Sequence, residues 1–284
     1  MTLKEAFLVL IKGAMLGIGN VIPGVSGGAL AISLGLYETI VNSLGNFFKD
    51  IRKNFKLLLP IILGTIIGIL SAGQLITFLL GQYKPQTILF FVGVIFGGVS
   101  IIMRKSRKEV TKSNLLLCLL IFVAVTLFNF LDFNAVSVPL DNLGYFDYIK
   151  IFFLGLLAST SMLIPGISSS IILMLAGFYR PIIEALKLLF TKEAFLNSFI
   201  ILAIFAIGVL LGLFLIAKVV SLLLKKYEFK AYWGILGFVL ASIVLLFLQI
   251  DTFTVNFTNI FTCILTFLWG YVLARCLERE KYFY

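Results

Sequence analysis

Six stretches of this chain are apolar over a length that matches the hydrocarbon core of a bilayer. They lie at about 57 to 80, 87 to 103, 115 to 131, 198 to 217, 231 to 248 and 258 to 275. A transmembrane helix needs about 20 such residues. Of the 284 residues, 61% are hydrophobic and only 13% are charged, which leaves too little polar surface for a water-soluble domain of this size. The sequence therefore predicts an all-α polytopic membrane protein with six crossings.

Two further apolar stretches, residues 7 to 44 and 149 to 186, are interrupted near their middle by proline, glycine and serine. The first contains GNVIPGVSGG at 19 to 28, and the second contains LIPGISSS at 163 to 170. Proline and glycine break helices, and each half of these stretches is too short to span a bilayer comfortably. We therefore expect each stretch to form a re-entrant helical hairpin.

The two interrupted stretches are copies of one another. At an offset of 142 residues, Gly13, Ile22, Pro23, Gly24, Ser26, Gly35, Tyr37 and Ile40 correspond to Gly155, Ile164, Pro165, Gly166, Ser168, Gly177, Tyr179 and Ile182. At an offset of 144, Gly64, Gly68, Tyr83 and Gly93 correspond to Gly208, Gly212, Tyr227 and Gly237. This pattern predicts repeat 1 at 1–140 and repeat 2 at 141–284. Because each repeat holds one hairpin and three crossings, we expect an inverted-topology repeat.

The basic residues test this topology independently, because lysine and arginine concentrate in cytoplasmic loops. With a cytoplasmic N-terminus, the 23 lysines and arginines all fall on the cytoplasmic side except Lys84, Lys150, Arg180, Lys187 and Lys192. The basic loop at 104 to 112 is interpreted as only a topology signal. We attribute the net charge of +10 to topology and anionic lipid rather than to nucleic acid. Both termini are predicted to be cytoplasmic.

The chain contains no histidine, and its three cysteines lie in or beside apolar runs. Histidine nucleophiles, histidine bases and histidine metal sites are therefore excluded. The sequence also shows no paired intramembrane carboxylates, so a membrane enzyme such as a lipid phosphatase lacks a nucleophile and a base. We expect no enzyme, no metal and no cofactor apart from a coupling ion, H⁺ or Na⁺.

The two proline-glycine turns place non-helical backbone at membrane depth, where unpaired N–H and C=O groups are costly unless protein, water or ligand satisfies them. Glycine allows close backbone approach, serine offers a hydroxyl, and a half-helix that starts after each turn directs N–H groups at it. These features favour a phosphate site near the midplane, where inverted hairpins converge; helix breaks packed against neighbours are the alternative. The candidate residues are Gly24, Ser26, Gly27, Gly28, Ser168, Ser169 and Ser170.

Three charged residues flank the predicted hairpins. Lys12 lies near the inner mouth of the first hairpin, and Arg180 lies just beyond the second hairpin. Both are candidates to escort a phosphate. The alternative is that their long side chains only extend to lipid head groups. Glu38 occupies the position of Arg180 in the repeat. It either carries a coupling proton, pairs with a base or is an ordinary charge at a helix end.

The pair IPGVSGG with SLGLYE, and LIPGISSS with LAGFY, resembles the bacterial polyprenyl-phosphate transporter family, and the likeness covers nearly the whole chain. The resemblance implies transport of undecaprenyl phosphate, the lipid carrier of cell-wall precursors, from the outer to the cytoplasmic leaflet of the cytoplasmic membrane. The positions that match the family motifs are Asn20, Pro23, Gly24, Val25, Ser26, Gly27, Gly28, Gly35, Tyr37, Pro165, Gly166, Ile167, Ser168, Gly177 and Tyr179.

This sequence departs from the family pattern at two positions. Ser169 stands where the second turn usually has glycine, and Ala29 stands where the first turn often has threonine. A secondary transporter or channel for a small anion is the alternative function, because the same core would permit it. The oligomeric state stays open, since the small-residue spacing of Gly64 with Gly68 suits packing within a chain or between chains.

Overall fold

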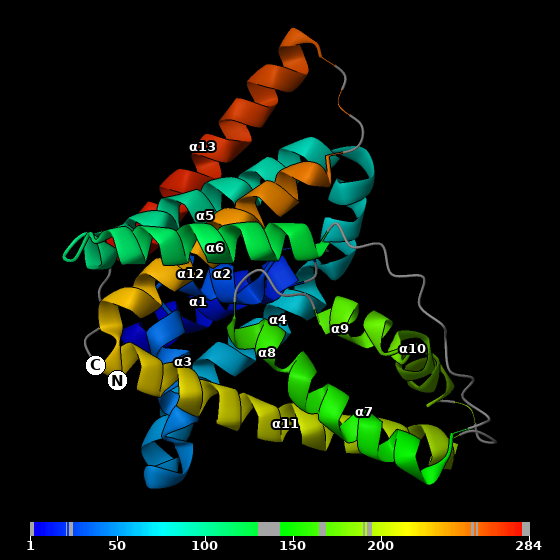
Figure 1. Ribbon diagram of the computed structural model, residues 1–284. Coiled ribbons are helices and arrows are strands. Elements are labelled where there is room, and N and C mark those ends of the chain that lie inside the picture. Colours follow the sequence, from blue (N-terminus) through cyan, green and yellow to red (C-terminus); the bar gives the residue numbers. More distant parts are fainter. Residues whose placement is uncertain are drawn as a thin grey trace.

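The computed structural model describes residues 3–20, 22, 25–129, 143–164, 169–189, 191, 195–250, 253 and 255–279. Within these residues all of the regular secondary structure is helical (Figure 1). The elements are α1 (Leu3–Asn20), α2 (Gly27–Ser33), α3 (Tyr37–Gly45), the short 3₁₀ helix η1 (Phe47–Lys49), α4 (Ile51–Gln82), α5 (Lys84–Ser106), α6 (Lys112–Asn129), α7 (Tyr145–Ala158), α8 (Thr160–Leu163), α9 (Ser169–Leu175), α10 (Tyr179–Leu188), α11 (Phe195–Lys226), α12 (Glu228–Leu248) and α13 (Phe257–Arg279).

Within the described residues, six helical segments are long and apolar enough to cross a membrane. Five agree with predicted crossings: Ile51–Ala72, Lys84–Ser106, Phe195–Lys226, Glu228–Leu248 and Phe257–Leu277. The sixth is Tyr145–Leu163, which we assigned to a hairpin arm; α7 and α8 continue one another with few charges and so reach the length of a span. The predicted crossing at 115 to 131 is described only in part, as the apolar stretch Lys112–Phe128, because residues 130 and 131 lie outside the described residues.

Glycines bring the first helix of each half into contact with a long helix. A methyl group on Gly13 would lie 2.6 Å from the carbonyl oxygen of Ile61, so α1 and α4 are packed backbone to backbone. At the corresponding position in the second half, a methyl group on Gly155 would clash with the carbonyl oxygen of Phe205. Helix α7 is therefore packed closely against α11. Such close approach is typical of small residues at membrane helix interfaces.

The small-residue spacings noted in the sequence serve the same contacts. A methyl group on Gly64 would clash with the carbonyl oxygen of Leu10, and one on Gly208 with that of Phe152. These glycines therefore pack helices within the chain.

The remaining long helices pair across the two halves. A methyl group on Gly237 would lie 2.5 Å from the carbonyl oxygen of Cys118, which places α12 against α6. One on Gly93 would clash with the carbonyl oxygen of Phe267, which places α5 against α13. Each half thus supplies one helix to each of these two pairs.

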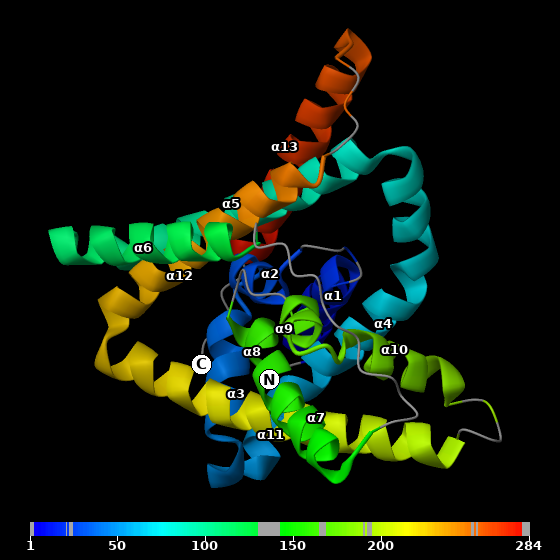
Figure 2. The ribbon, with the colours of Figure 1, turned by 45° about the vertical axis from the view of Figure 1, so that its right-hand side comes forward.

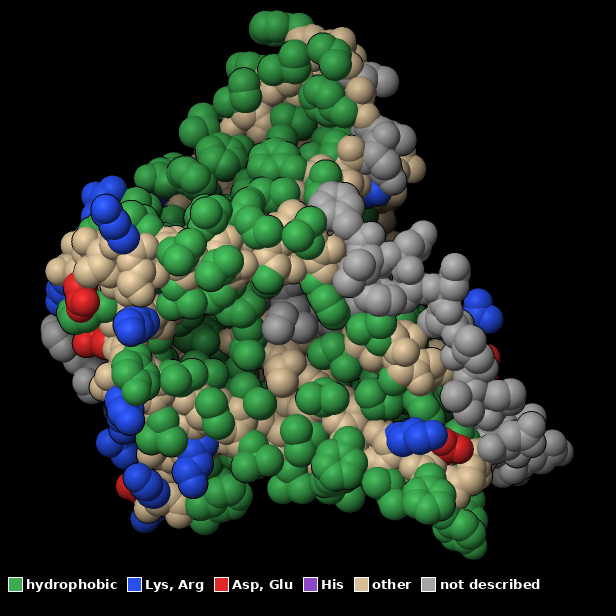
Figure 3. Space-filling view, viewed as in Figure 1, with side chains coloured by type: hydrophobic (Ala, Val, Ile, Leu, Met, Phe, Trp, Pro, Cys, Tyr) green, Lys and Arg blue, Asp and Glu red, His purple; other side chains and the backbone are tan. Residues whose placement is uncertain are grey.

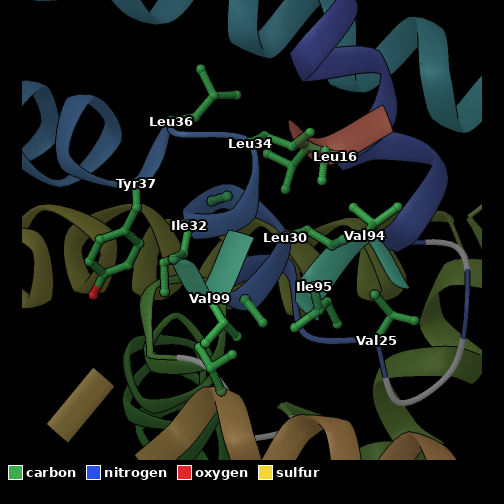
Figure 4. Close-up of a cluster of buried hydrophobic side chains, with 14 of the residues drawn as sticks. Leu16, Val25, Leu30, Ile32, Leu34, Leu36, Tyr37, Val94, Ile95 and Val99 are labelled. Carbon is green, nitrogen blue, oxygen red and sulfur yellow. The ribbon is translucent and has the colours of Figure 1, made fainter. Parts of the chain in front are cut away.

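Short helix α2 lies in the middle of the molecule and contacts α8, which in turn contacts α9, and the long helices α4, α5, α11 and α12 surround them (Figure 2). Residues Gly28–Ser33 of α2 are all buried. Leu30 and Ile32 belong to a cluster of apolar side chains that includes Val94, Ile95 and Val99 of α5 (Figure 4). The Ser33 hydroxyl also donates to the carbonyl oxygens of Ala29 and Ile95, at 2.9 Å and 3.2 Å, and this second bond fixes α2 against α5.

The same turn follows α2 and α9. Gly35 has φ of +71° and Gly177 has φ of +78°, a left-handed conformation that glycine adopts without strain. The N–H of Leu36 donates to the carbonyl oxygen of Ala31, and the N–H of Phe178 donates to that of Leu173. Both helices therefore end in a Schellman motif, at positions that the sequence aligned.

The broken segments of the two halves extend toward opposite sides of the molecule. In Figure 1, α1 and α3 lie to the left, α7 and α10 lie to the right, and α2, α8 and α9 lie between them. Lysine and arginine side chains gather along the left edge, near the α5–α6 and α11–α12 connections, while apolar side chains cover much of the remaining face (Figure 3). The helices thus have one strongly basic end.

Candidate functional site

The first turn brings Asn20, Ser26 and Gly27 together. Ser26 is the N-cap of α2, with an extended backbone (φ −78°, ψ 119°). Its hydroxyl oxygen accepts a hydrogen bond from the N–H of Ala29 at 3.4 Å. A methyl group on Gly27 would lie 2.5 Å from Oδ1 of Asn20, so the absence of a side chain there admits the Asn20 amide. Asn20 is exposed at the end of α1, Val25 is buried, and Gly28 is buried in the first turn of α2.

The second turn is described only at its edges. Gly166, Ile167 and Ser168, like Gly24 of the first turn, lie outside the described residues, and of Ser169 and Ser170 only the helical backbone is described. Helix α9 begins at Ser169, the position that corresponds to Gly27 at the start of α2. Helix α8, which ends just before the second turn, contacts α2. The elements that flank the two turns therefore meet in the middle of the molecule.

The two predicted escort cations occupy different environments. Lys12 is only 5% exposed and lies on the same face of α1 as the buried Val9 and Leu16. Arg180 is exposed in the first turn of α10, at the side of the molecule opposite α3, and within the described part of the chain no carboxylate forms an ion pair with it.

Glu38 pairs with a base. One of its carboxylate oxygens accepts hydrogen bonds from the ammonium of Lys105 and from the hydroxyl of Tyr232. Lys105 also donates to the Tyr232 hydroxyl at 2.8 Å, and its Nζ lies 4.8 Å from the centroid of the Tyr232 ring. The three side chains come from the first turn of α3, the end of α5 and the start of α12, so the cluster joins both halves.

No group of three or more cysteine, aspartate or glutamate side chains capable of holding a metal occurs in the described ranges. At the first turn the structure brings together the Asn20 amide and the Ser26 hydroxyl, and in the Glu38 cluster an ammonium and a hydroxyl converge on a carboxylate. Amide, hydroxyl and ammonium donors suit an oxyanion.

Comparison with known proteins places the chain in a family. The profile of a family described as undecaprenyl phosphate translocase-like matches residues 15–264. A polyprenyl-phosphate transporter of Staphylococcus aureus is 31% identical over 276 residues, which cover 95% of this chain and 95% of that protein. This chain belongs to the undecaprenyl phosphate translocase-like family.

A second relative in the same family is a polyprenyl-phosphate transporter of Vibrio cholerae, 27% identical over 249 residues that cover 82% of this chain and 75% of that protein. No solved structure gives a significant match. The family assignment confirms the resemblance drawn from the paired proline-glycine turns.

The sequence did not identify two of the three residues of the Glu38 cluster as site residues. Lys105 was assigned to a loop that only reports topology, and Tyr232 was not considered. Lys105 is 67 residues from Glu38 in the chain and Tyr232 is 194 residues away, so no local spacing could have linked them. The one available signal was the charge of Glu38 itself, which required a partner near an apolar core.

Proposed function

We propose that this protein is a transporter that moves undecaprenyl phosphate from the outer to the cytoplasmic leaflet, so that the carrier lipid can be reused in cell-wall synthesis. The observation that carries this proposal is the match over 95% of the chain to a relative named polyprenyl-phosphate transporter. The proposed activity is transport without chemical conversion of the lipid, and the cytoplasmic membrane of a bacterium is the proposed location.

The proposed head-group site is the pair of turns. Asn20, Ser26 and Gly27 are in contact and can present an amide, a hydroxyl and backbone N–H groups to a phosphate. Val25 and Gly28 shape the first turn; Gly24 and the second-turn residues Gly166, Ile167, Ser168, Ser169 and Ser170 complete the proposal from the sequence repeat. The contact between α2 and α8 supports one shared site. Lys12 and Arg180 are proposed to attract the phosphate from opposite sides.

The proposed topology is an inverted repeat with two re-entrant hairpins and with both termini in the cytoplasm. The opposite directions of α1 with α3 and of α7 with α10, and the matching turns at Gly35 and Gly177, support it. The gathering of lysine and arginine at the end where α1 begins supports a cytoplasmic N-terminus.

The substrate's isoprenoid tail does not have to pass through the protein. Outward-facing apolar side chains are frequent on the long helices, for example Leu70 of α4 at 78% exposure and Leu210 of α11 at 56%. The tail can therefore stay in lipid while the phosphate crosses along a polar route. The energy source we propose is a gradient of H⁺ or Na⁺, with Glu38 as the candidate coupling group, and transport under imposed gradients of each ion tests this.

The test is binding of long-chain and short-chain prenyl phosphate, against inorganic phosphate, to purified protein. Ser26→Ala should weaken prenyl phosphate binding about tenfold, because it removes a hydroxyl that can bond a charged group. Ser242→Ala is the matched control, since among the described residues the Ser242 hydroxyl makes one hydrogen bond, which it donates to the carbonyl oxygen of Phe238 within α12. Equal binding of inorganic and prenyl phosphate would instead favour transport of a small anion.

A further inference from the structure

The Glu38 cluster is an open site with two converging donors. The ammonium of Lys105 and the hydroxyl of Tyr232 point at one position, which a Glu38 oxygen now occupies. The Lys105 and Glu38 side chains are 34% and 43% exposed, whereas Tyr232 is 7% exposed. The donors are thus held by a buried ring, while the charged groups remain accessible.

An ammonium beside a hydroxyl can bind any oxyanion, and a phosphate monoester competes well with a carboxylate. It can carry two negative charges where the carboxylate carries one, and it has more acceptor oxygens. Lysine binds phosphate as a point charge, so it does not depend on the planar geometry of a carboxylate. The cluster also lies at the basic end of the molecule, where the surrounding lysines and arginines favour the more highly charged anion (Figure 3).

The two halves carry opposite charges at one pair of corresponding positions, so the two sides of the molecule differ in how they meet an anion. Glu38 and Arg180 occupy corresponding positions in the two halves. On the α10 side, an arriving anion meets an exposed arginine that no carboxylate in the described residues neutralises. On the α3 side, it meets a lysine that already holds a carboxylate.

We propose that Lys105 and Tyr232 form a second anion-binding site, which takes a phosphate monoester. When no phosphate is bound, the Glu38 carboxylate occupies this site as an internal competitor. The identity of the ligand as the head group of a lipid rests on the proposed function. The carboxylate lowers the affinity of this site for phosphate, and its return to Lys105 displaces the phosphate. The basic side of the protein is therefore a site of release.

The test compares Glu38→Gln with Lys105→Met in the purified full-length protein at fixed ionic strength. Binding of farnesyl phosphate and of inorganic phosphate is measured for each variant by calorimetry. Glu38→Gln should tighten binding about tenfold, because it removes a charged competitor, and Lys105→Met should weaken it by a similar factor. The double variant should bind no better than Lys105→Met alone. A purely structural ion pair predicts the same direction for both single variants, since each breaks it.

Two further variants keep the test valid if Lys105→Met does not fold. Lys105→Arg should retain binding, and Tyr232→Phe should weaken it by removing the hydroxyl while keeping the ring. Asp147→Asn is the matched control, because Asp147 pairs with Lys150 at 2.8 Å within α7, away from this cluster. It should leave binding unchanged.

The outcomes separate this inference from the proposed function. Opposite effects of Glu38→Gln and Lys105→Met on farnesyl phosphate support the second site. The same pattern with inorganic phosphate alone, with no binding of the prenyl lipid, supports the site but refutes the proposed substrate. A third outcome is that Ser26→Ala weakens prenyl phosphate binding, while Glu38→Gln and Lys105→Met change it in the same direction or not at all. This outcome leaves the proposed function in place and overturns the second site.

Discussion

Gly35 and Gly177 hold the same left-handed backbone conformation at corresponding points of the two halves, with φ of +71° and +78°. Each ends a short helix that follows a proline-glycine turn, and in each case the two Schellman hydrogen bonds are present. The duplication seen in the sequence is therefore also a duplication of local backbone geometry. Glycine is required at these positions because other residues are strained there.

Gly35→Ala is expected to destabilise the protein by about 1 to 2 kcal/mol, the cost of placing a Cβ in the left-handed region. No atom lies within 4 Å of the position of that Cβ, so the effect isolates backbone strain. Gly81→Ala is the matched control, because Gly81 also has open space around it but lies inside α4 with a helical φ. Alanine there should be neutral or slightly stabilising. Thermal unfolding in detergent measures both, and a shift of the same sign in the two variants would contradict the prediction.

Gly64→Ala should be more damaging than a comparable change on α12. A methyl group on Gly64 would clash with the carbonyl oxygen of Leu10, and neither helix backbone can yield without separating α1 from α4. Overpacking of this kind costs about 1 to 3 kcal/mol. Gly234→Ala is the control, since the nearest atom is the flexible Cδ1 of Ile121 at 3.2 Å. Equal melting temperatures for the two variants would mean that α1 and α4 do not meet at Gly64.

How much of this architecture the sequence could predict depends on how local each feature is. The helices and the matching glycine turns were predictable because apolar length and the spacing of Gly35 with Gly177 are readable along the chain. The partners of the glycines were not. Gly237 signals a close approach, but nothing in the sequence says that the neighbouring backbone is that of Cys118 in the other half.

The candidate site divides in the same way. Ser26 was predictable as an N-cap because serine before a new helix has a well-known role. The cluster of Glu38, Lys105 and Tyr232 was not, because its members come from three helices and meet only after the halves have packed. Tyr145–Leu163, expected as a hairpin arm, has the length and apolar composition of a span, so apolar length alone does not distinguish a crossing from a re-entrant arm.

Asn42 and Ser221 join the two halves, and a double-mutant cycle should detect this. The Ser221 hydroxyl donates to the Asn42 side-chain oxygen at 2.8 Å, from α11 to α3. We expect Asn42→Ala and Ser221→Ala each to destabilise the protein and the pair to show a coupling energy of about 0.5 to 1.5 kcal/mol. Ser221→Ala combined with Gly81→Ala provides an additive control. Strict additivity for the Asn42 and Ser221 pair would exclude a direct contact between α3 and α11 at this point.

Gly27→Ala should impair ligand binding without unfolding the protein. Its Cβ would lie 2.5 Å from Oδ1 of Asn20, so the Asn20 amide must turn away from the Ser26 turn. Because Asn20 is exposed at the end of α1, it can move at little cost in stability. If the head group binds at this turn, prenyl phosphate affinity should fall about tenfold, the loss expected for one bond to a charged group. Asn20→Ala should cause a similar loss and should add little to Gly27→Ala, since both changes remove the same amide. Binding titrations together with melting curves distinguish this from misfolding, and unchanged affinity in both variants would place the phosphate elsewhere.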